Sequence, residues 1–142
     1  MKDIELTVVI PSYNESENLK KGVLAQVDDY LKKQKLSYEV IIVDDGSSDS
    51  SVELIKKFIA KKENFRLIEN PHGGKAIAVI TGMSEGKGEK ILFTDMDQAT
   101  PIDQWDKFAP KFEEGFDIVI GQRQGRKGAP FVRNVAAWGF SF

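Results

Sequence analysis

Short runs of β-branched and apolar residues alternate along this chain with longer stretches whose apolar residues recur every three or four positions. This alternation constrains the fold strongly, because strands that are connected through helices pair in parallel. Strands are predicted at 4–10, 38–45, 65–70, 89–95 and 116–123, and helices at 15–34, 48–62, 75–86 and 102–115. The sequence therefore predicts an α/β fold with a mostly parallel sheet and helices on both of its faces.

Composition narrows the class of protein further. The chain has 142 residues and no cysteine, so it can form one domain with a sizeable core and holds no disulfide or thiolate metal site. The net charge of −2 argues against a nucleic-acid partner. No apolar run reaches the ~18 residues of a membrane-spanning helix. The absence of disulfides fits a reducing compartment, so we expect a cytoplasmic protein with a single domain over residues 1–142.

Two carboxylates follow the fourth predicted strand: Asp95 and Asp97, separated only by Met96. In open α/β sheets, ligands bind beyond the carboxyl ends of the strands. Two carboxylates at this spacing can both approach a hard cation such as Mg²⁺ or Mn²⁺, and a cation held there can stabilise a diphosphate as a leaving group. The alternative is that Asp95 caps a loop and Asp97 is solvated, and the short pattern alone leaves both interpretations open.

Two further stretches allow a structural or a functional interpretation. Asp44 and Asp45 end the second predicted strand in a segment typical of turns and helix caps, but a carboxylate there can also accept an N–H group from a nucleobase. Gly73 and Gly74 precede the third predicted helix, where backbone amides can face an anion or form a plain loop. The one histidine, His72, is predicted to be a loop residue.

Five stretches occur in an order and spacing that resemble family 2 glycosyltransferases with the GT-A fold: VVIPSYNESENL, YEVIIVDDGSSDSS, GGKAIAVITGM, ILFTDMDQATP and DIVIGQR. The resemblance covers essentially the whole chain and implies a Rossmann-like domain that binds a nucleotide-diphosphate sugar. Within that family, the chain is most similar to enzymes that transfer a sugar to a polyprenyl or dolichyl phosphate. The segment DQATP is closer to the glucosyl branch of these enzymes than to the mannosyl branch.

The resemblance also implies roles for individual residues. The donor-binding residues would be Pro11, Tyr13, Glu15, Asp44, Asp45, Lys75, Asp95, Met96 and Asp97. The first three would line the nucleoside pocket, with Tyr13 beside the base, and Asp45, with Asp44, would bind the base or ribose. Asp95 and Asp97 would hold Mg²⁺ or Mn²⁺ against the diphosphate. The catalytic residues would be Asp97 and Arg123, the latter near the phosphates or the donor sugar.

The chain departs from the family pattern at several positions. Met96 replaces the usual alanine between the two carboxylates. Ala76 and Ile77 replace glycines, and Ile80 replaces an arginine. These replacements weaken the expectation of phosphate contacts from the helix that starts near Lys75.

The implied reaction is inverting transfer of a hexose, from UDP-glucose in preference to GDP-mannose, to a polyprenyl phosphate at the cytoplasmic membrane surface. A phosphate acceptor is already ionised near neutral pH, so the reaction needs no catalytic base. The 25 residues after Asp117 carry a charge of +4 and include Phe131, Trp138, Phe140 and Phe142, which suits peripheral contact with an anionic lipid. A basic loop followed by a core helix explains this tail equally well.

Family members continue beyond the position that corresponds to Phe142, so we expect the chain to lack a C-terminal part that a further segment or a partner protein supplies. Two alternatives stay open: a non-catalytic nucleotide-sugar-binding half-domain, and a glycosyltransferase acting on a sugar hydroxyl in cell-surface polysaccharide synthesis. A haloacid-dehalogenase phosphatase is disfavoured, because Thr100 lies three positions after Asp97 rather than two. A sugar nucleotidyltransferase is disfavoured because no glycine-rich loop follows the first strand.

Overall fold

The computed structural model describes residues 3–122, and its centre is a four-stranded parallel sheet. The strands are β1 (Leu6–Ser12), β2 (Tyr38–Asp44), β3 (Phe65–Glu69) and β4 (Lys90–Phe93), in the spatial order β3-β2-β1-β4. The two inner strands are buried along almost their whole length because both of their faces are covered, as is usual for parallel sheets. The predicted α/β class with a parallel sheet is confirmed.

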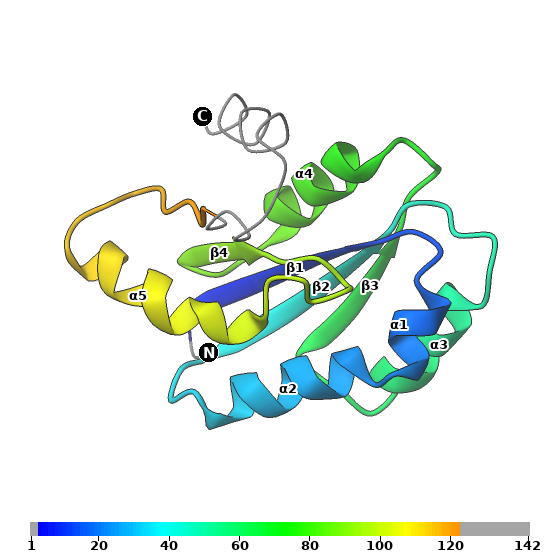
Figure 1. Cartoon of the computed structure of the whole chain (residues 1–142), viewed down its shortest axis with the longest axis horizontal. Helices are drawn as coiled ribbons and strands as arrows, with labels where there is room; N and C mark the ends of the chain where they lie inside the picture. The colour runs from blue at the N-terminus through cyan, green and yellow to red at the C-terminus, as the bar shows by residue number, and fades with distance from the viewer. Residues whose placement is uncertain (1–2, 123–142) are drawn as a thin grey trace, which may run out of the picture. The chain divides into compact units, whose positions relative to one another are not determined.

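Helices cover both faces of the sheet (Figure 1). The helices are α1 (Ser16–Lys20), α2 (Val23–Lys33), α3 (Ser51–Ile59) and α4 (Lys75–Glu85). The chain passes from β1 to β2 and on to β3 through α1, α2 and α3, which share one face, and returns through α4 on the other face to reach β4. The order of strands therefore reverses between β1 and β4, as right-handed crossovers on opposite faces require.

One glycine sets how closely α4 approaches the sheet. A Cβ atom on Gly82 would lie 2.3 Å from Cγ1 of Val9 and 3.2 Å from Cγ2 of Val43, far inside van der Waals contact. The adjacent turn of α4 contributes Ala78 to a fully buried cluster with Val9, Ile41 and Val43. Small residues on this face of α4 thus let the helix backbone lie directly on β1 and β2.

Two predicted elements differ from the structure. The helix predicted at 15–34 is divided into α1 and α2, because Gly22 adopts a left-handed conformation with φ of +81° that other residues rarely adopt. The strand predicted at 116–123 is absent over residues 116–122. Ile118 and Ile120 are 78% and 70% exposed there, and without a neighbouring strand their alternating pattern forms no ladder. Residue 123 lies outside the described part.

The chain divides into two compact units, which meet between Asp103 and Gln104. The first holds the sheet and α1 to α4. The turn η1 (Ile102–Gln104) spans the boundary, and the second unit holds α5 (Trp105–Glu113). In α5 the rings of Trp105 and Phe112 lie 5.9 Å apart. Over residues 3–122, no helix is long and apolar enough to cross a membrane.

Candidate functional site

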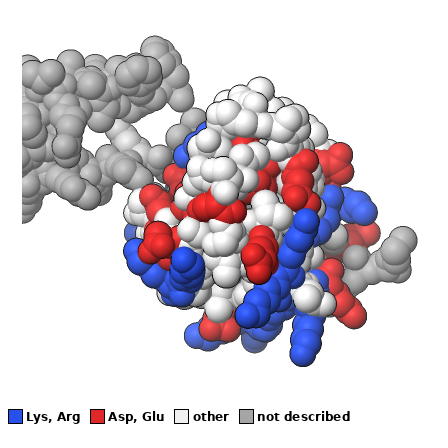
Figure 2. Space-filling model, turned by 90° about the vertical axis from the view of Figure 1, so that its right-hand side faces the viewer, with Lys and Arg blue, Asp and Glu red and all other residues white. Residues whose placement is uncertain are grey.

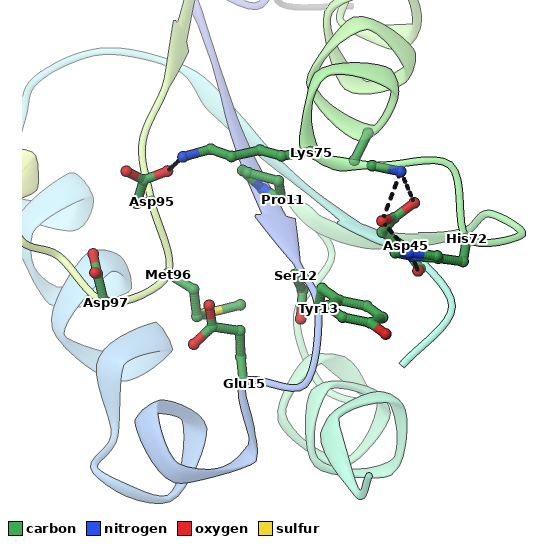
Figure 3. Close-up of a pocket in the computed structure, with 12 residues that line it drawn as sticks. Pro11, Ser12, Tyr13, Glu15, Asp45, His72, Lys75, Asp95, Met96 and Asp97 are labelled. Atoms are coloured by element: carbon green, nitrogen blue, oxygen red, sulfur yellow. Dashed lines mark hydrogen bonds and ion pairs between the residues drawn. The ribbon is translucent and has the colours of Figure 1, made fainter. Parts of the chain in front are cut away.

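A cavity of about 260 Å³ lies at the carboxyl ends of the strands, where the chain leaves β1 and β4 (Figure 3). This is the point at which the strand order reverses, where open α/β sheets bind their ligands. Four segments that are distant in sequence meet here: the end of β1, the residue that follows β2, the loop that leads into α4 with the first turn of α4, and the loop after β4. The cavity is lined by Pro11, Ser12, Tyr13, Glu15, Asp45, His72, Gly74, Lys75, Ala78, Asp95, Met96 and Asp97.

Asp45, just after β2, is held by the loop that precedes α4. Its Oδ1 accepts hydrogen bonds from the amides of Gly73 at 2.8 Å and Gly74 at 3.2 Å, and its Oδ2 accepts a second contact from Gly74 at 3.0 Å. The Gly73 amide does most to lower the pKa of the Asp45 carboxyl below its ordinary value. Burial opposes that shift, while the Gly74 amide and His72 reinforce it. Asp45 therefore holds this loop as an ionised acceptor.

Asp44 has a different environment from its neighbour. Its carboxylate accepts hydrogen bonds from the amides of Gly46 at 3.1 Å and Ser47 at 2.9 Å, and from the Ser47 hydroxyl at 2.6 Å. It does not line the cavity. The turn interpretation therefore accounts for the position of Asp44, and its predicted contact with the base or ribose stays a prediction.

The loop after β1 is fastened to the loop after β2. Asn14 adopts a left-handed conformation with φ of +51°, in which its Oδ1 accepts the amide of Ser48 at 2.8 Å. The next amide along, that of Glu15, donates to the hydroxyl of Ser51 at 2.8 Å. These bonds position Tyr13 and Glu15 at the cavity from a backbone that is anchored on both sides.

Asp95 and Asp97 lie in the loop after β4, and within residues 3–122 the carboxylate of each has one close partner. Oδ1 of Asp97 accepts the amide of Ala99 at 2.9 Å. The loop itself is held by Gln98, whose amide nitrogen donates to the carbonyl of Asp95 at 2.7 Å. Across the cavity, Nζ of Lys75 lies 2.5 Å from Oδ1 of Asp95 (Figure 3). The ion pair joins the first residue of α4 to the loop after β4.

Four residues that line the cavity were not among the predicted site residues: Ser12, His72, Gly74 and Ala78. The ring of His72 stacks on Tyr13, with 4.6 Å between centroids and 24° between planes, and its Nδ1 lies 2.9 Å from Oδ2 of Asp45. Ser12 is buried, and its Oγ has no hydrogen-bond partner among residues 3–122. A polar residue at the very end of a buried strand was the available signal for Ser12. No local signal brings His72 to Tyr13, because the two are 59 positions apart.

The residues present fit a divalent cation that is shared with a phosphate ligand. Over the described residues, no cluster of three or more His, Cys, Asp or Glu side chains could hold a metal by itself. Asp95 and Asp97 supply carboxylate oxygens, which Mg²⁺ and Mn²⁺ prefer. Mg²⁺ commonly takes only one or two protein carboxylates and completes its shell with substrate phosphates and water.

The structure brings most of the predicted site together. The predicted residues that line the cavity are Pro11, Tyr13, Glu15, Asp45, Lys75, Asp95, Met96 and Asp97. Met96 is almost fully buried, so its side chain forms part of the cavity wall. Arg123 lies outside the described residues.

Comparison with solved structures identifies the class of fold. S. aureus TarS, residues 1–349, is 25% identical with a TM-score of 0.62, over 89% of this chain and 38% of that chain. The mannosyltransferase PcManGT from Pyrobaculum calidifontis, solved in complex with GDP-Man and Mn²⁺, is 25% identical with a TM-score of 0.60, over 78% of this chain and 32% of that chain. The architecture is that of GT-A glycosyltransferases.

The family follows from the sequence match. The model of glycosyl transferase family 2 matches residues 7–139, and the chain belongs to this family. One relative is the undecaprenyl-phosphate 4-deoxy-4-formamido-L-arabinose transferase of Salmonella choleraesuis (strain SC-B67), 31% identical over 93% of this chain and 41% of its own length. The chain spans 41 or 42% of the length of the first curated relatives that it matches.

Proposed function

We propose that the cavity binds a nucleotide-diphosphate sugar together with Mg²⁺ or Mn²⁺, and that the protein transfers the hexose to a polyprenyl phosphate. The observation that carries the proposal is the position of Asp95, Asp97 and Lys75. Two carboxylates and one ammonium group face one cavity, at the point of the sheet where the strand order reverses. This set can hold a metal ion and a diphosphate at the same place.

Charge supports the participation of a cation. Among residues 3–122, the carboxylates that line the cavity belong to Glu15, Asp45, Asp95 and Asp97, and the lining contains one lysine. Such a cavity repels a diphosphate unless additional positive charge is bound with it. Over the face toward which the strands point, acidic and basic side chains are interspersed (Figure 2). The broader surface therefore provides no single-sign field that could replace the cation.

We place the nucleoside at the side of the cavity formed by Pro11, Tyr13 and Asp45. Tyr13 is 47% exposed, which leaves ring surface for a base to stack upon. Asp45 is ionised and can accept an N–H group of uracil or guanine. Both of its oxygens already have partners, so the base must take the place of His72 at Oδ2.

The diphosphate then lies between Lys75 and the two carboxylates of the loop after β4. A bound cation would supply positive charge to the departing nucleotide diphosphate. Lys75 and the amino-terminal end of α4 add positive potential on the other side of the phosphates. Asp95 and Asp97 orient the donor, and Arg123 steadies the donor sugar or the phosphates.

Transfer proceeds with inversion at the anomeric carbon. An oxygen of the acceptor phosphate forms the new bond from the face opposite the nucleotide, as the bond between the anomeric carbon and the diphosphate oxygen breaks. The leaving nucleotide diphosphate keeps the bonding electron pair. The acceptor is already an anion, so no side chain needs to remove a proton, and positioning is the main task of the protein. The name of the Salmonella relative, an undecaprenyl-phosphate transferase, supports this acceptor class.

Two measurements test the proposal. Calorimetry with the 142-residue chain should show tighter binding of UDP or GDP with Mn²⁺ than with a chelator. Equal affinities would contradict the participation of a metal in nucleotide binding. In the second, the protein in its natural full-length context is given radiolabelled UDP-glucose or GDP-mannose and polyprenyl phosphate. Label should enter the lipid fraction. Label on a soluble sugar hydroxyl, and never on lipid, would show that the acceptor assignment is wrong.

A further inference from the structure

We propose that Lys75 is the resident counter-ion of Asp95 in the free protein, and that Lys75 and a divalent cation occupy Asp95 alternately. This inference rests on the proposed function, because it assumes that a metal and a nucleotide diphosphate share the cavity. It adds a regulatory consequence: the free protein binds the metal weakly, and the donor nucleotide raises the affinity for the metal by drawing Lys75 away.

The first observation is the ion pair itself. Nζ of Lys75 and Oδ1 of Asp95 are 2.5 Å apart, which is a full salt-bridge contact. The pair connects two segments that only the fold brings together, and both residues line the cavity. The ammonium group therefore lies at one of the two carboxylates that would receive the metal.

The second observation is that the pair can exchange. The side chain of Lys75 is 60% exposed and that of Asp95 is 38% exposed. Neither partner is locked by burial, and a lysine side chain rotates readily among its rotamers. In the described part of the chain, Asp97 has no lysine or arginine within salt-bridge distance. Among the described residues, one carboxylate of the pair is thus paired with a cationic side chain and the other is not.

Electrostatics makes the two partners mutually exclusive. An ammonium group and a dication on the same carboxylate repel each other strongly at contact distance. A metal that binds Asp95 must therefore displace Lys75. A diphosphate offers the displaced ammonium a new anionic partner within the same cavity. Metal and nucleotide are then coupled, and by linkage each raises the affinity for the other by the same factor.

The test is a titration of Mn²⁺ into the 142-residue chain without nucleotide. Binding is measured by calorimetry and by the electron paramagnetic resonance signal of free Mn²⁺. Lys75→Gln should bind Mn²⁺ about three- to tenfold more tightly than the wild type, because a partly exposed ion pair corresponds to a factor of roughly two to five and a repelling charge is also removed. Lys75→Arg, which keeps the charge, should stay near the wild type.

Two controls locate the effect. Lys57→Gln removes the same charge from an exposed position on α3 that does not line the cavity, and it should leave the Mn²⁺ affinity unchanged. The double variant Lys75→Gln with Asp95→Asn should lose the gain in affinity, because the gain depends on Asp95. Circular dichroism checks that each variant is folded.

The outcomes separate this inference from the proposed function. If Lys75→Gln binds Mn²⁺ no more tightly than the wild type, or shows no binding, the inference is overturned, even where UDP still binds with Mn²⁺. If UDP binds neither with nor without Mn²⁺, the proposed function fails instead. A coupling factor between UDP and Mn²⁺ that is smaller in Lys75→Gln than in the wild type supports the alternation, and an unchanged factor contradicts it.

Discussion

Two acidic pairs lie on either side of β1, and they differ in what holds them. Asp44 and Asp45, after β2, accept hydrogen bonds from the backbone amides of two loops. Asp95, after β4, faces the side chain of Lys75. An amide moves only when its loop moves, whereas a lysine side chain changes rotamer readily. Residues of one type, at equivalent ends of parallel strands, can therefore fix a loop in one place and stay exchangeable in another.

The largest effect that follows from this comparison is on stability. We expect Asp45→Ala to lower the melting temperature by roughly 5 °C, because the amides of Gly73 and Gly74 lose a charged acceptor. Asp97→Ala, which loses one local hydrogen bond, should stay within about 1 °C of the wild type. Thermal unfolding followed by circular dichroism measures both. Equal melting temperatures for the two variants would remove the distinction between the pairs.

The second effect is on nucleotide binding, where we expect the pair after β4 to matter more than it does for stability. With Mn²⁺ present, Asp97→Ala should bind UDP about tenfold or more weakly than the wild type, and its affinity should no longer depend on the metal. Calorimetry with Mn²⁺ and with a chelator provides the comparison. Glu63→Ala, an exposed acid outside the cavity, is the matched control. Retained metal dependence in Asp97→Ala would assign the metal to other residues.

A smaller effect concerns base selectivity at Asp45. Uracil offers an N–H group where cytosine has an acceptor, so UDP should bind more tightly than CDP, but only by about threefold while His72 occupies Oδ2. His72→Ala removes the imidazole from that oxygen, which keeps the Gly74 amide as a partner, and the preference should rise toward about tenfold. Competition calorimetry with both nucleotides measures the ratio. An unchanged ratio in His72→Ala would mean that Asp45 does not contact the base.

The smallest effect is a dependence on pH. The pKa of Asp45 is lowered in the folded protein, so its contribution to stability is fully present above its ordinary pKa of 3.8. That contribution is lost as the pH falls through the lowered value. Urea midpoints measured from pH 6 down to about pH 3 should therefore fall more steeply for the wild type than for Asp45→Asn. Parallel curves would indicate that other groups govern acid unfolding.

Periodicity and strand ends predicted most of the fold and the gathering of site residues. Pro11, Asp45 and Asp95 could be placed at one edge, because the carboxyl ends of parallel strands share an edge. The pairing of Lys75 with Asp95 could not be predicted, because it depends on where α4 begins and on how closely α4 packs against the sheet. The stretch 116–122 shows a different reason for failure. Its alternating apolar residues indicate a strand, but a strand forms only where a neighbouring strand supplies hydrogen-bond partners.

Gly82 does not line the cavity, yet it determines where the side chain of Lys75 lies. Lys75 and Gly82 are separated by about 10 Å along α4, from seven residues at 1.5 Å each. With the helix pressed onto Val9 and Val43 at Gly82, the first turn of α4 has a fixed height above the strand ends. An alanine at this position would lift the helix off the sheet and carry Lys75 away from Asp95. The absence of a side chain at Gly82 thus sets which partners the ammonium group of Lys75 can reach, two helical turns away.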